Sequence, residues 1–594
     1  MKKQVQIIIS AVVLVTIMIF LSPAVVLSNS FFWQGTDVSD SGPEVGLLDY
    51  TMHKEVHDKL LEALPVLLYS DSIPDPDGGV GGNGNLNRMY GGTLTGERGL
   101  RLWDPSKTWD GYTLLGTALI DMEGNIVHIY EASTGSFGGA AKMIKGGDVI
   151  SSERGNLVQR DWCGVEIKRF DGLSNHHDHQ REGSAVGYNH PGYKVRTNRG
   201  VTLSLGAVTV SPTEDFVNND NETVEIDPES YIYDPATLGI VDVKRFDASR
   251  PDRPIRDDVI RELPWDWDGT NALFEWHARD HFDPDPATNP GDLGFGLAED
   301  YAARYALDLG LNSGGSTNFW ANTSENRQGL VGIHAEDWSH GNSAAWLGKN
   351  KWFKRKGKGK RYIDYRFHPD NIIADFRSLN TTIIIARHDH PDGDWLEGDI
   401  VWRLGPHYGT DGPDGKVGQI IGQHLAYMIP NGLPGAGNIL VFDNGGGAGY
   451  GALIEGLTDP ITEEKLGFWP NKYRTFSRVL EINPMTKQLV WQYVQAKPTE
   501  GDGIGNNHIF FSNIMAGAQR LKNGNTLITE ADTGRLFEVT EEGDVVWEYA
   551  KTDDIPGQGP FASSTYRAYR IPYSWVHPEL LRDHDVNGVY DVCE

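Results

Sequence analysis

The stretch AQRLKNGNTLITEADTGRLFEVTEEGDVVWEYA (residues 518–550) indicates the fold of this chain. It separates into four short segments, AQRL, NTLITE, RLFEVT and DVVWEY, with Asn-Gly and Glu-Glu-Gly at turns between them. Asn-Gly between segments of alternating hydrophobicity is a strong signal for a β-hairpin. The stretch therefore predicts a four-stranded antiparallel sheet.

The last segment of this stretch recurs along the chain. Its copies are NIVHIYE (125–131), CGVEIKRF (163–170), NALFEWH (271–277), GDIVWRLG (398–405) and KQLVWQYV (487–494). Four-stranded units that recur about six times are typical of a β-propeller, in which ring closure hides the sheet edges. We therefore predict an all-β fold, a six-bladed β-propeller over residues 111–575. A small mixed N-terminal domain or cap over residues 30–110, with a helix at 50–68, is expected to precede it.

Composition supports an exposed, soluble β-rich body. The chain has 594 residues, of which 70 are glycine and 17 are tryptophan. Its formal net charge is −29, from 82 acidic and 53 basic residues. This charge argues against nucleic acid as a partner, because a phosphate backbone would be repelled. An anionic substrate would need cationic groups placed locally around it.

The N-terminus predicts export. Lys2 and Lys3 precede an uninterrupted apolar run over residues 7–21, and small residues follow it. This pattern is typical of a signal peptide over residues 1–29, and its length also fits an N-terminal membrane anchor. Both interpretations place the body of the protein outside the cytoplasm, in the periplasm, on the cell surface or in the medium.

Three histidines share one phase of the repeat. His177, His340 and His424 each open the first strand that follows a copy of the repeated segment. The innermost strand of each blade lines the channel of a propeller, so equivalent positions converge on one mouth of it. We expect the three imidazoles to meet in a site. The neighbouring His176 leaves open which of the two adjacent histidines faces it.

Two further polar residues are candidates for the same site. Asn342 lies two residues after His340, so both side chains share one face of a strand. Arg387 ends the apolar segment TTIIIA (381–386), and its planar guanidinium suits an oxyanion such as sulfate or phosphate. The residues that follow, 388–390, are expected to lie in a turn rather than in a metal cluster.

Several of these motifs resemble one known family. HHDHQREGSAVGY, DWSHGNS, IIIAR, GDIVWRLGP, and GQHLAYMIPNG with GNILVFDNG are similar to segments of the arylsulfate sulfotransferase family, exported six-bladed β-propellers. The resemblance implies transfer of a sulfuryl group from an aryl sulfate donor to a phenolic acceptor, with no nucleotide donor and no cofactor. It also implies that His424 is the nucleophile. The residues that it implies as supporting groups are His177, His340, Asn342 and Arg387.

The chemistry is consistent with these side chains. A neutral imidazole is a competent nucleophile near neutral pH, and attack by His424 on sulfur would form a sulfohistidine and release a phenolate. A second phenol would then take the group in a ping-pong cycle. Protonated His340 or His177 could donate to the leaving oxygen. Arg387 and Asn342 could hold the oxygens of the transferred group.

The C-terminal tail, residues 576–594, contains the pattern DHDVNGVYDVCE, which fits an EF-hand loop without its exiting helix. A structural calcium site and a chance run of acidic and amide residues are both consistent with it. The candidate ligands are Asp583, Asp585, Asn587, Asp591 and Glu594.

Two other features have alternative interpretations. Cys163 and Cys593 are the only cysteines, and in an exported chain they are consistent with one disulfide or with two unpaired thiols. The basic run KNKWFKRKGKGKR (349–361) could be a docking loop for a polyanion or a solvated hairpin tip.

Two functions from other classes compete with sulfuryl transfer. A metal-dependent hydrolase could use the histidine cluster, although no matching carboxylate opens the repeat units. A non-catalytic propeller could bind a polyanion or a surface partner through the basic run.

Overall fold

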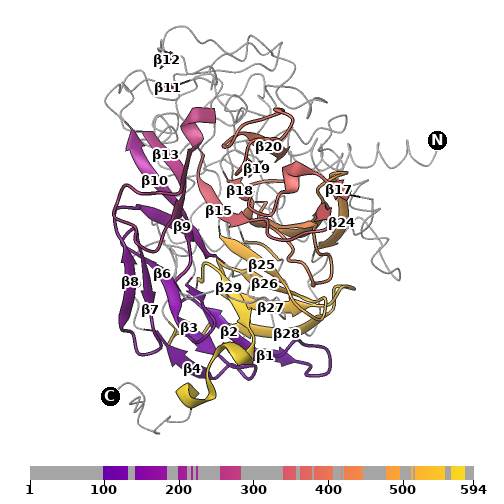
Figure 1. Ribbon diagram of the computed structural model, residues 1–594. Coiled ribbons are helices and arrows are strands. Elements are labelled where there is room, and N and C mark those ends of the chain that lie inside the picture. The colour runs from indigo at the N-terminus through magenta and orange to yellow at the C-terminus, as the bar shows by residue number, and fades with distance from the viewer. Residues whose placement is uncertain are drawn as a thin grey trace, which may run out of the picture.

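The computed structural model describes residues 98–130, 141–182, 199–210, 216–217, 223–224, 255–281, 339–355, 361–377, 380–405, 417, 420–445, 477–494, 510–512, 515–555 and 564–581. Within these residues, six antiparallel sheets of four or five strands are arranged in a ring (Figure 1). The prediction of an all-β, six-bladed propeller is therefore confirmed.

The first three blades follow one another from the indigo to the magenta part of the chain in Figure 1. Blade 1 consists of β29 (Ala568–Ile571), β2 (Tyr112–Leu115), β3 (Ala118–Ile120) and β4 (Ile126–Ile129). Blade 2 consists of β5 (Lys142–Met143), β6 (Val149–Glu153), β7 (Asn156–Arg160) and β8 (Glu166–Phe170). Blade 3 consists of β9 (Asn175–Arg181), β10 (Thr202–Val210), β13 (Ile255–Leu263) and β14 (Phe274–His277).

The other three blades complete the ring. Blade 4 consists of β15 (Gly341–Trp346), β18 (Ile372–Phe376), β19 (Thr381–Ile385) and β20 (Ile400–Leu404). Blade 5 consists of β21 (His424–Met428), β22 (Ile439–Asp443), β23 (Arg478–Asn483) and β24 (Gln488–Tyr493). Blade 6 consists of β25 (Ala516–Arg520), β26 (Thr526–Glu530), β27 (Arg535–Val539), β28 (Val545–Ala550) and β1 (Gly99–Trp103).

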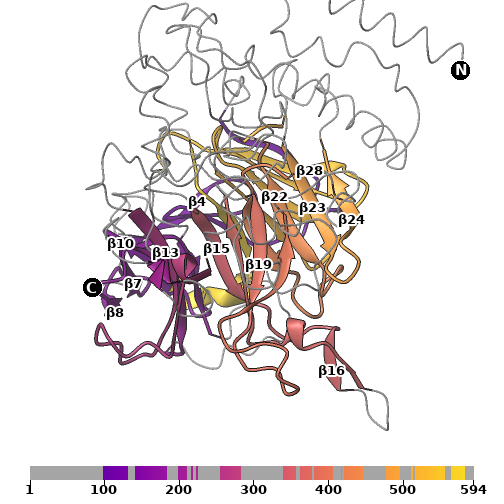
Figure 2. The same cartoon turned by 90° about the horizontal axis from the view of Figure 1, so that it is seen from above.

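Smaller elements lie outside the six blades. They are the strand pairs β11 (Phe216–Val217) with β12 (Thr223–Val224) and β16 (Phe353–Arg355) with β17 (Arg361–Ile363), and the 3-10 helices η3 (Ala278–His281), η4 (Tyr365–Phe367), η6 (Tyr573–Trp575) and η7 (Pro578–Leu581). The hairpin β16–β17 carries part of the basic run and projects from blade 4 (Figure 2). Over the described ranges the helical elements are short turns, and none of them could cross a membrane. Residues 1–97, which include the expected leader, lie outside those ranges.

Blade 6 forms as its turn residues predict. At the Asn-Gly turn between β25 and β26, the Leu521 amide donates to the Asn525 carbonyl oxygen at 2.7 Å, and Gly524 has φ +102°. Gly543 has φ +94° between β27 and β28. A side chain is strained in this left-handed region, so glycine lets the chain reverse within a few residues.

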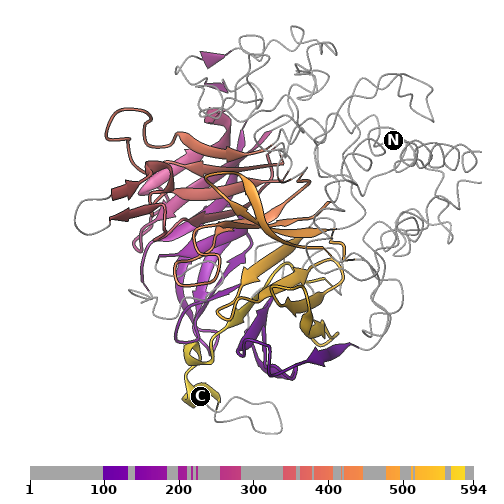
Figure 3. The ribbon, with the colours of Figure 1, turned by 90° about the vertical axis from the view of Figure 1, so that its right-hand side faces the viewer.

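The two ends of the described chain close the ring. β29 pairs with β2 in blade 1, and β1 pairs with β28 in blade 6, so segments distant in sequence lie side by side (Figure 3). β1 thus covers the outer edge of β28, which would otherwise expose unpaired peptide groups. The expected cap over 30–110 was consequently drawn too long, because residues 99–103 belong to a propeller sheet.

Buried aromatic rings fill the space between blades 5 and 6. Phe510 lies 5.4 Å from both Phe442 of β22 and Phe537 of β27, measured between ring centroids. Tyr493 of β24 lies 5.6 Å from Phe537. All four side chains are buried. Packing of this kind supplies the apolar burial that holds neighbouring sheets together.

A buried cation joins the closing strand to both of its neighbours. Arg570 of β29 is fully buried, and its guanidinium lies 3.1 Å from the Glu538 carboxylate of blade 6. It also donates to the Trp109 carbonyl oxygen at 2.7 Å and to the Thr113 hydroxyl oxygen at 2.9 Å. Ring closure therefore depends on a charge pair that is shielded from water.

We expect Arg570→Ala to lower the free energy of unfolding by about 3–5 kcal/mol, because it leaves the Glu538 carboxylate buried without its partner. Urea unfolding followed by tryptophan fluorescence would measure the change. The control is Arg169→Ala, since Arg169 pairs with the exposed Glu166; this loss should cost less than about 1 kcal/mol. Equal effects of the two substitutions would show that the Arg570 pair does not hold the ring closed.

Candidate active site

Three histidines stand at the starts of neighbouring innermost strands. His177 lies in β9, His340 immediately precedes β15, and His424 is the first residue of β21. The ring centroids of His177 and His340 are 4.8 Å apart. The ring of Tyr566 lies 5.6 Å from that of His177 and 6.3 Å from that of His424. The structure thus brings together the imidazoles that share one phase of the repeat.

The backbone at these strand starts departs from regular β geometry. His177 and His340 have φ values of 60° and 48°, and Leu425, next to His424, has φ 51°. The pairing of each of these strands with its neighbour shifts register at the same place. Left-handed φ is strained for residues other than glycine and clusters at functional sites. Because the left-handed φ recurs in three blades, we infer that the strained backbone serves a function.

The segment NHHDH gives its three histidines different environments. His177 faces the site, whereas the Nε2 of His176 lies 3.0 Å from an Asp258 carboxylate oxygen of β13. His179 is 1% exposed and is buried within the blade. The choice between His176 and His177, open from the sequence, is thereby settled: His177 is the residue that contacts His340.

Hydrogen bonds fix the tautomer of His424. Its Nδ1 lies 2.8 Å from the Asn444 side-chain oxygen and 3.1 Å from the Gly422 carbonyl oxygen. Asn444 is held in this orientation because its amide nitrogen donates to the Ser512 carbonyl oxygen at 2.7 Å. Both neighbours of Nδ1 are acceptors, so Nδ1 carries the proton and Nε2 keeps its lone pair. Burial, then repulsion from Arg377 and Arg567, lowers the pKa of His424 well below 6.5, so the ring is neutral.

A second chain of contacts reaches His177. The Nδ1 atoms of His176 and His177 are 2.5 Å apart, so one of them must carry the hydrogen between them. His176 Nε2 lies 3.0 Å from an Asp258 carboxylate oxygen, although without the alignment of a hydrogen bond. A carboxylate favours the proton on the nitrogen that faces it. This places Nδ1–H on His177 as the donor to His176 and leaves the lone pair on Nε2 of His177. Burial, followed by repulsion from His340 and His176, lowers the pKa of His177 well below 6.5.

Guanidinium groups that the sequence interpretation missed lie beside the imidazoles. The Arg377 amide donates to the His340 carbonyl oxygen at 3.0 Å, which places Arg377 at the histidine end of blade 4. Arg567 donates to the Asn342 carbonyl oxygen at 2.7 Å and lies 3.3 Å from the Asp178 carboxylate. Repulsion from both cations lowers the pKa of His424. Their charge suits an anionic group next to its Nε2.

Arg387 does not lie at this site, and the expectation that it binds the transferred group is wrong. Its guanidinium pairs with Glu262 at 2.8 Å, contacts Glu397, and stacks 4.1 Å from the centroid of the Phe274 ring. Two carboxylates therefore neutralise the charge of this side chain.

Strand direction explains the error. In blade 4, Gly341 pairs with Phe376 at the histidine end, whereas Ile372 pairs with Ile385 at the opposite end. A residue that follows β18 therefore returns to the histidines, and one that follows β19 leaves them. Arg377 follows β18 in the sequence ADFRSLN, so an arginine after that apolar strand was the signal to use.

Asn342 is present at the site but has a bracing role. It is fully buried, and its amide nitrogen donates to the Gln423 carbonyl oxygen at 3.1 Å. Its own carbonyl oxygen accepts from Arg567. Asn342 therefore positions the residue before His424 and the Arg567 guanidinium.

Other predicted sites fall partly outside the described residues. Cys163 is disulfide-bonded, and Cys593, the other cysteine of the chain, lies outside these residues. The expected calcium ligands lie there as well, namely Asp583, Asp585, Asn587, Asp591 and Glu594.

Comparison with known proteins adds little beyond the fold. No protein-family model and no curated protein matches the chain. A solved protein of unknown function from Bacteroides caccae is 11% identical, with 78% of this chain and 99% of that chain covered and a TM-score of 0.35. The Dos1 propeller is 8% identical, with 77% of each chain covered and a TM-score of 0.25. Likeness at this level carries no inference about function.

The buried histidine of β9 predicts a pH dependence of stability. Burial, then repulsion from Lys142, lowers the pKa of His179 from 6.5 to about 3. Between these values the unfolded chain binds more protons than the folded one, so stability falls as pH falls. His179→Gln removes this contribution. Its destabilisation relative to wild type should shrink by about 1.4 kcal/mol for each pH unit below 6.5, measured by urea unfolding at pH 7 and pH 5.

His277→Gln is the control with the opposite sign. Burial lowers the pKa of His277, but hydrogen bonds to Asp257 and Glu275 outweigh it and the pKa is raised. The stabilisation from His277 is thus present below 6.5 and is lost as pH rises through the raised value. A pH-independent difference between His179→Gln and wild type would contradict the neutral buried state of His179.

Proposed function

We propose that this protein transfers a sulfuryl group from an aryl sulfate ester to a phenolic acceptor through a sulfohistidine on His424. The observation that carries the proposal is the state of that imidazole. It is neutral, its Nδ1–H is held by Asn444 and Gly422, and its Nε2 lone pair is free to attack. A buried imidazole fixed in this tautomer beside cationic groups is suited to nucleophilic catalysis on an anion.

The charge and the aromatic ring beside His424 suit an aryl sulfate ester. Arg377 and Arg567 are close enough to His424 to depress its pKa, and the same positive charge would attract the sulfate oxygens. The ring of Tyr566 would pack against the aryl group of a substrate, because it lies beside the rings of both His177 and His424. Local positive charge is required because the chain as a whole carries a formal charge of −29.

In the first half of the cycle, Nε2 of His424 attacks the sulfur of the donor. The N–S bond forms, the S–O bond to the aryl group breaks, and the phenolate leaves with the bond electrons. A phenolate is a good leaving group because the pKa of its conjugate acid is about 10. The proton on Nδ1 of His424 stays on that nitrogen, where it remains hydrogen-bonded to the Asn444 side-chain oxygen.

In the second half, the acceptor phenol must lose its proton as it attacks. His177 is the base, because its Nε2 lone pair is directed away from His176 and its pKa is low enough to keep the ring neutral. The acceptor oxygen forms the new S–O bond as its proton passes to Nε2 of His177, the N–S bond breaks, and His424 is regenerated. Because the pKa of His177 is low, His177 then gives this proton to solvent, where it balances the phenolate released in the first half. Asp258 and His176 hold the tautomer of His177 that this step requires.

The proposal includes the setting of the reaction. The basic and apolar residues at the N-terminus support export of the protein. Outside the cytoplasm, aryl sulfates and phenols could reach it, and the reaction needs no nucleotide sulfate donor. No step in the cycle uses a metal ion or an organic cofactor, because the imidazole itself carries the transferred group.

We expect the protein to release a chromogenic phenol from its sulfate ester only when an acceptor phenol is added, and without added metal. His424→Ala should lower this rate by ~10³-fold or more, because the nucleophile is lost. His577→Ala, a change of an exposed histidine, should leave the rate unchanged. Release that needs no acceptor, or a His424→Ala variant that stays active while folded, would refute the proposal.

A second prediction separates the two halves of the cycle. In Asp258→Asn the side-chain amide would face His176 and favour the opposite tautomer of the His176–His177 pair. The initial burst of donor phenol should stay intact, while acceptor-dependent turnover falls by ~10-fold or more.

Asp257→Asn is the matched control for this variant. Asp257 is the preceding residue of β13 and is also buried, but it pairs with His277 at 2.6 Å, outside the site. Asp257→Asn should leave both the initial burst and the acceptor-dependent turnover unchanged. If Asp258→Asn reduced the burst as strongly as the turnover, His177 would have no separate role in the second half.

A further inference from the structure

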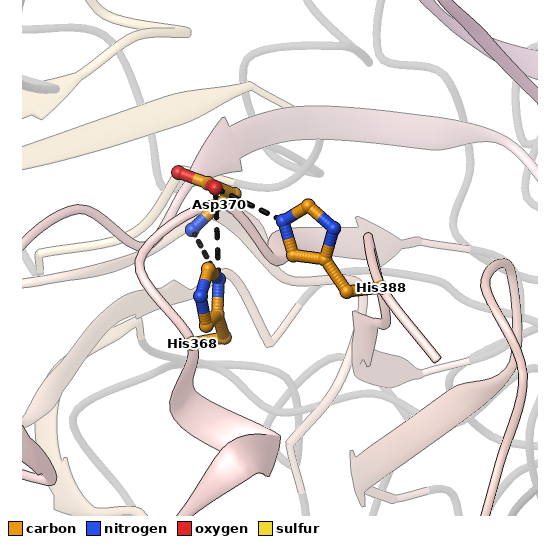
Figure 4. Close-up of side chains that lie close together, drawn as sticks. All are labelled: His368, Asp370 and His388. Atoms are coloured by element: carbon orange, nitrogen blue, oxygen red, sulfur yellow. Dashed lines mark hydrogen bonds and ion pairs between the residues drawn. The ribbon is translucent and has the colours of Figure 1, made fainter. Parts of the chain in front are cut away.

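A second group of polar side chains lies at the other end of blade 4. His368 follows η4, Asp370 lies in the turn before β18, and His388 follows β19. Figure 4 shows both imidazole rings turned toward the Asp370 carboxylate. Each residue offers one ligand atom, and the three atoms lie within 4.8 Å of one another. This is the end of the blade opposite to His340, so the group is separate from the candidate active site.

The distances fit a small transition-metal ion. His388 Nε2 lies 3.0 Å and His368 Nδ1 lies 3.7 Å from the same oxygen of Asp370. Metal–ligand bonds of about 2.0–2.1 Å in a tetrahedral site place neighbouring ligand atoms roughly 3.3 Å apart. Both distances lie close to this value, so binding requires shifts of a few tenths of an ångström along these two edges. The two imidazole nitrogens lie within 4.8 Å of each other, so a bound ion would draw them together and replace the hydrogen bond that His368 Nδ1 accepts from the Asp370 amide.

The two segments that carry the ligands are rigidly joined. Asn371 is buried, and its amide nitrogen donates to the Tyr365 and Arg366 carbonyl oxygens of η4. Its side-chain oxygen accepts from the Arg387 amide at 3.0 Å. One side chain thus fixes the segment before Asp370 to the segment that carries His388. The scaffold is preorganised, as a metal site requires.

Packing also orients the imidazole of His368. The ring of Phe353, from the hairpin β16–β17, packs edge-on against it with centroids 4.5 Å apart. The His368 and His388 rings lie 4.7 Å apart with an interplanar angle of 82°. The hairpin that carries the basic run therefore supports the ring of one ligand.

We propose that His368, Asp370 and His388 bind a divalent transition metal of the zinc type, with solvent completing its coordination. Two imidazoles and one carboxylate are ligands that zinc favours, whereas magnesium and calcium favour oxygen atoms alone. The bound ion would bridge η4 and the loop after β19 and hold this end of blade 4 together. The proposal does not depend on sulfuryl transfer.

Isothermal titration of the chelator-treated full chain with ZnCl₂ tests the proposal. We expect one equivalent to bind, and His388→Ala and Asp370→Asn to weaken that binding by ~10-fold or more, since each removes a ligand. Zinc should also raise the unfolding temperature of the wild type but not of His388→Ala. His388 and Asp370 are exposed, so neither change should unfold the blade.

Two controls locate the ion. His390→Ala changes a histidine of the same loop, whose Nδ1 lies 3.2 Å from Asp394, and should retain binding. His424→Ala should also retain it, because the channel histidines belong to another site. Absence of zinc binding to the wild type, or equal binding by His388→Ala, would overturn the proposal. Loss of binding in His424→Ala alone would place the ion in the channel and overturn it as well.

Discussion

The innermost strand of each blade has no neighbouring strand on its channel side, so its amides on that side need other hydrogen-bond acceptors. The structure depends on where these acceptors come from. Polar side chains of the preceding blade supply them. Between blades 3 and 4, Asp178 accepts from the Ala344 amide at 3.1 Å and Gln180 from the Trp346 amide at 2.8 Å. The same relation recurs at three further junctions. Between blades 4 and 5, Ser343 and Asp375 accept from the Ala426 amide; between blades 5 and 6, Tyr427 accepts from the Arg520 amide; and between blades 6 and 1, Thr529 and Gln519 accept from the Ala568 and Arg570 amides. An unpaired buried amide costs about 1–3 kcal/mol, so these contacts set the register between blades.

The same contacts hold the candidate active site. Asp258 accepts from the Gly341 amide at 2.6 Å, which fixes the start of β15 directly after His340, and its other oxygen faces His176. The Ser343 hydroxyl donates to the Asp375 carboxylate of its own blade at 2.8 Å and accepts from the Ala426 amide of blade 5, two residues after His424, at 3.1 Å. The strained backbone at the histidines is therefore held in place by hydrogen bonds from two neighbouring blades. A change at one blade junction would move both the blade and its imidazole.

The sequence predicted what is local and repeated. The Asn-Gly turn and the alternating segments of 518–550 define a blade without reference to any other part of the chain, and the phase of His177, His340 and His424 follows from the repeat. Arg387 was misassigned because its place depends on the direction of β19, which required β18 to be recognised first. Asn444 and Arg567 were missed for other reasons. Arg567 precedes β29 of blade 1 and acts on Asn342 of blade 4, and no pattern within one repeat encodes such a contact. Asn444 belongs to the same blade as His424 and lies two residues beyond Phe442, the partner of His424 in β22, so finding it required the pairing of β21 with β22.

Charge distinguishes the channel histidines from the histidines at the opposite end of blade 4 more sharply than residue type does. At the channel, repulsion from Arg377 and Arg567 acts on the neutral His424 imidazole even though Arg567 also pairs with Asp178, so the field at this ring favours an anion over a dication. At the opposite end, Asp370 lies between two imidazoles, and the arginine nearest in sequence, Arg387, is neutralised by Glu262 and Glu397. There a dication would meet the Asp370 carboxylate and two imidazole nitrogens, and it would displace the hydrogen shared by His388 Nε2 and Asp370. The two proposals, a nucleophilic imidazole at one end and metal-binding imidazoles at the other, both rest on this difference in neighbouring charge, and the antiparallel order of β18 and β19 decides which arginine lies at which end.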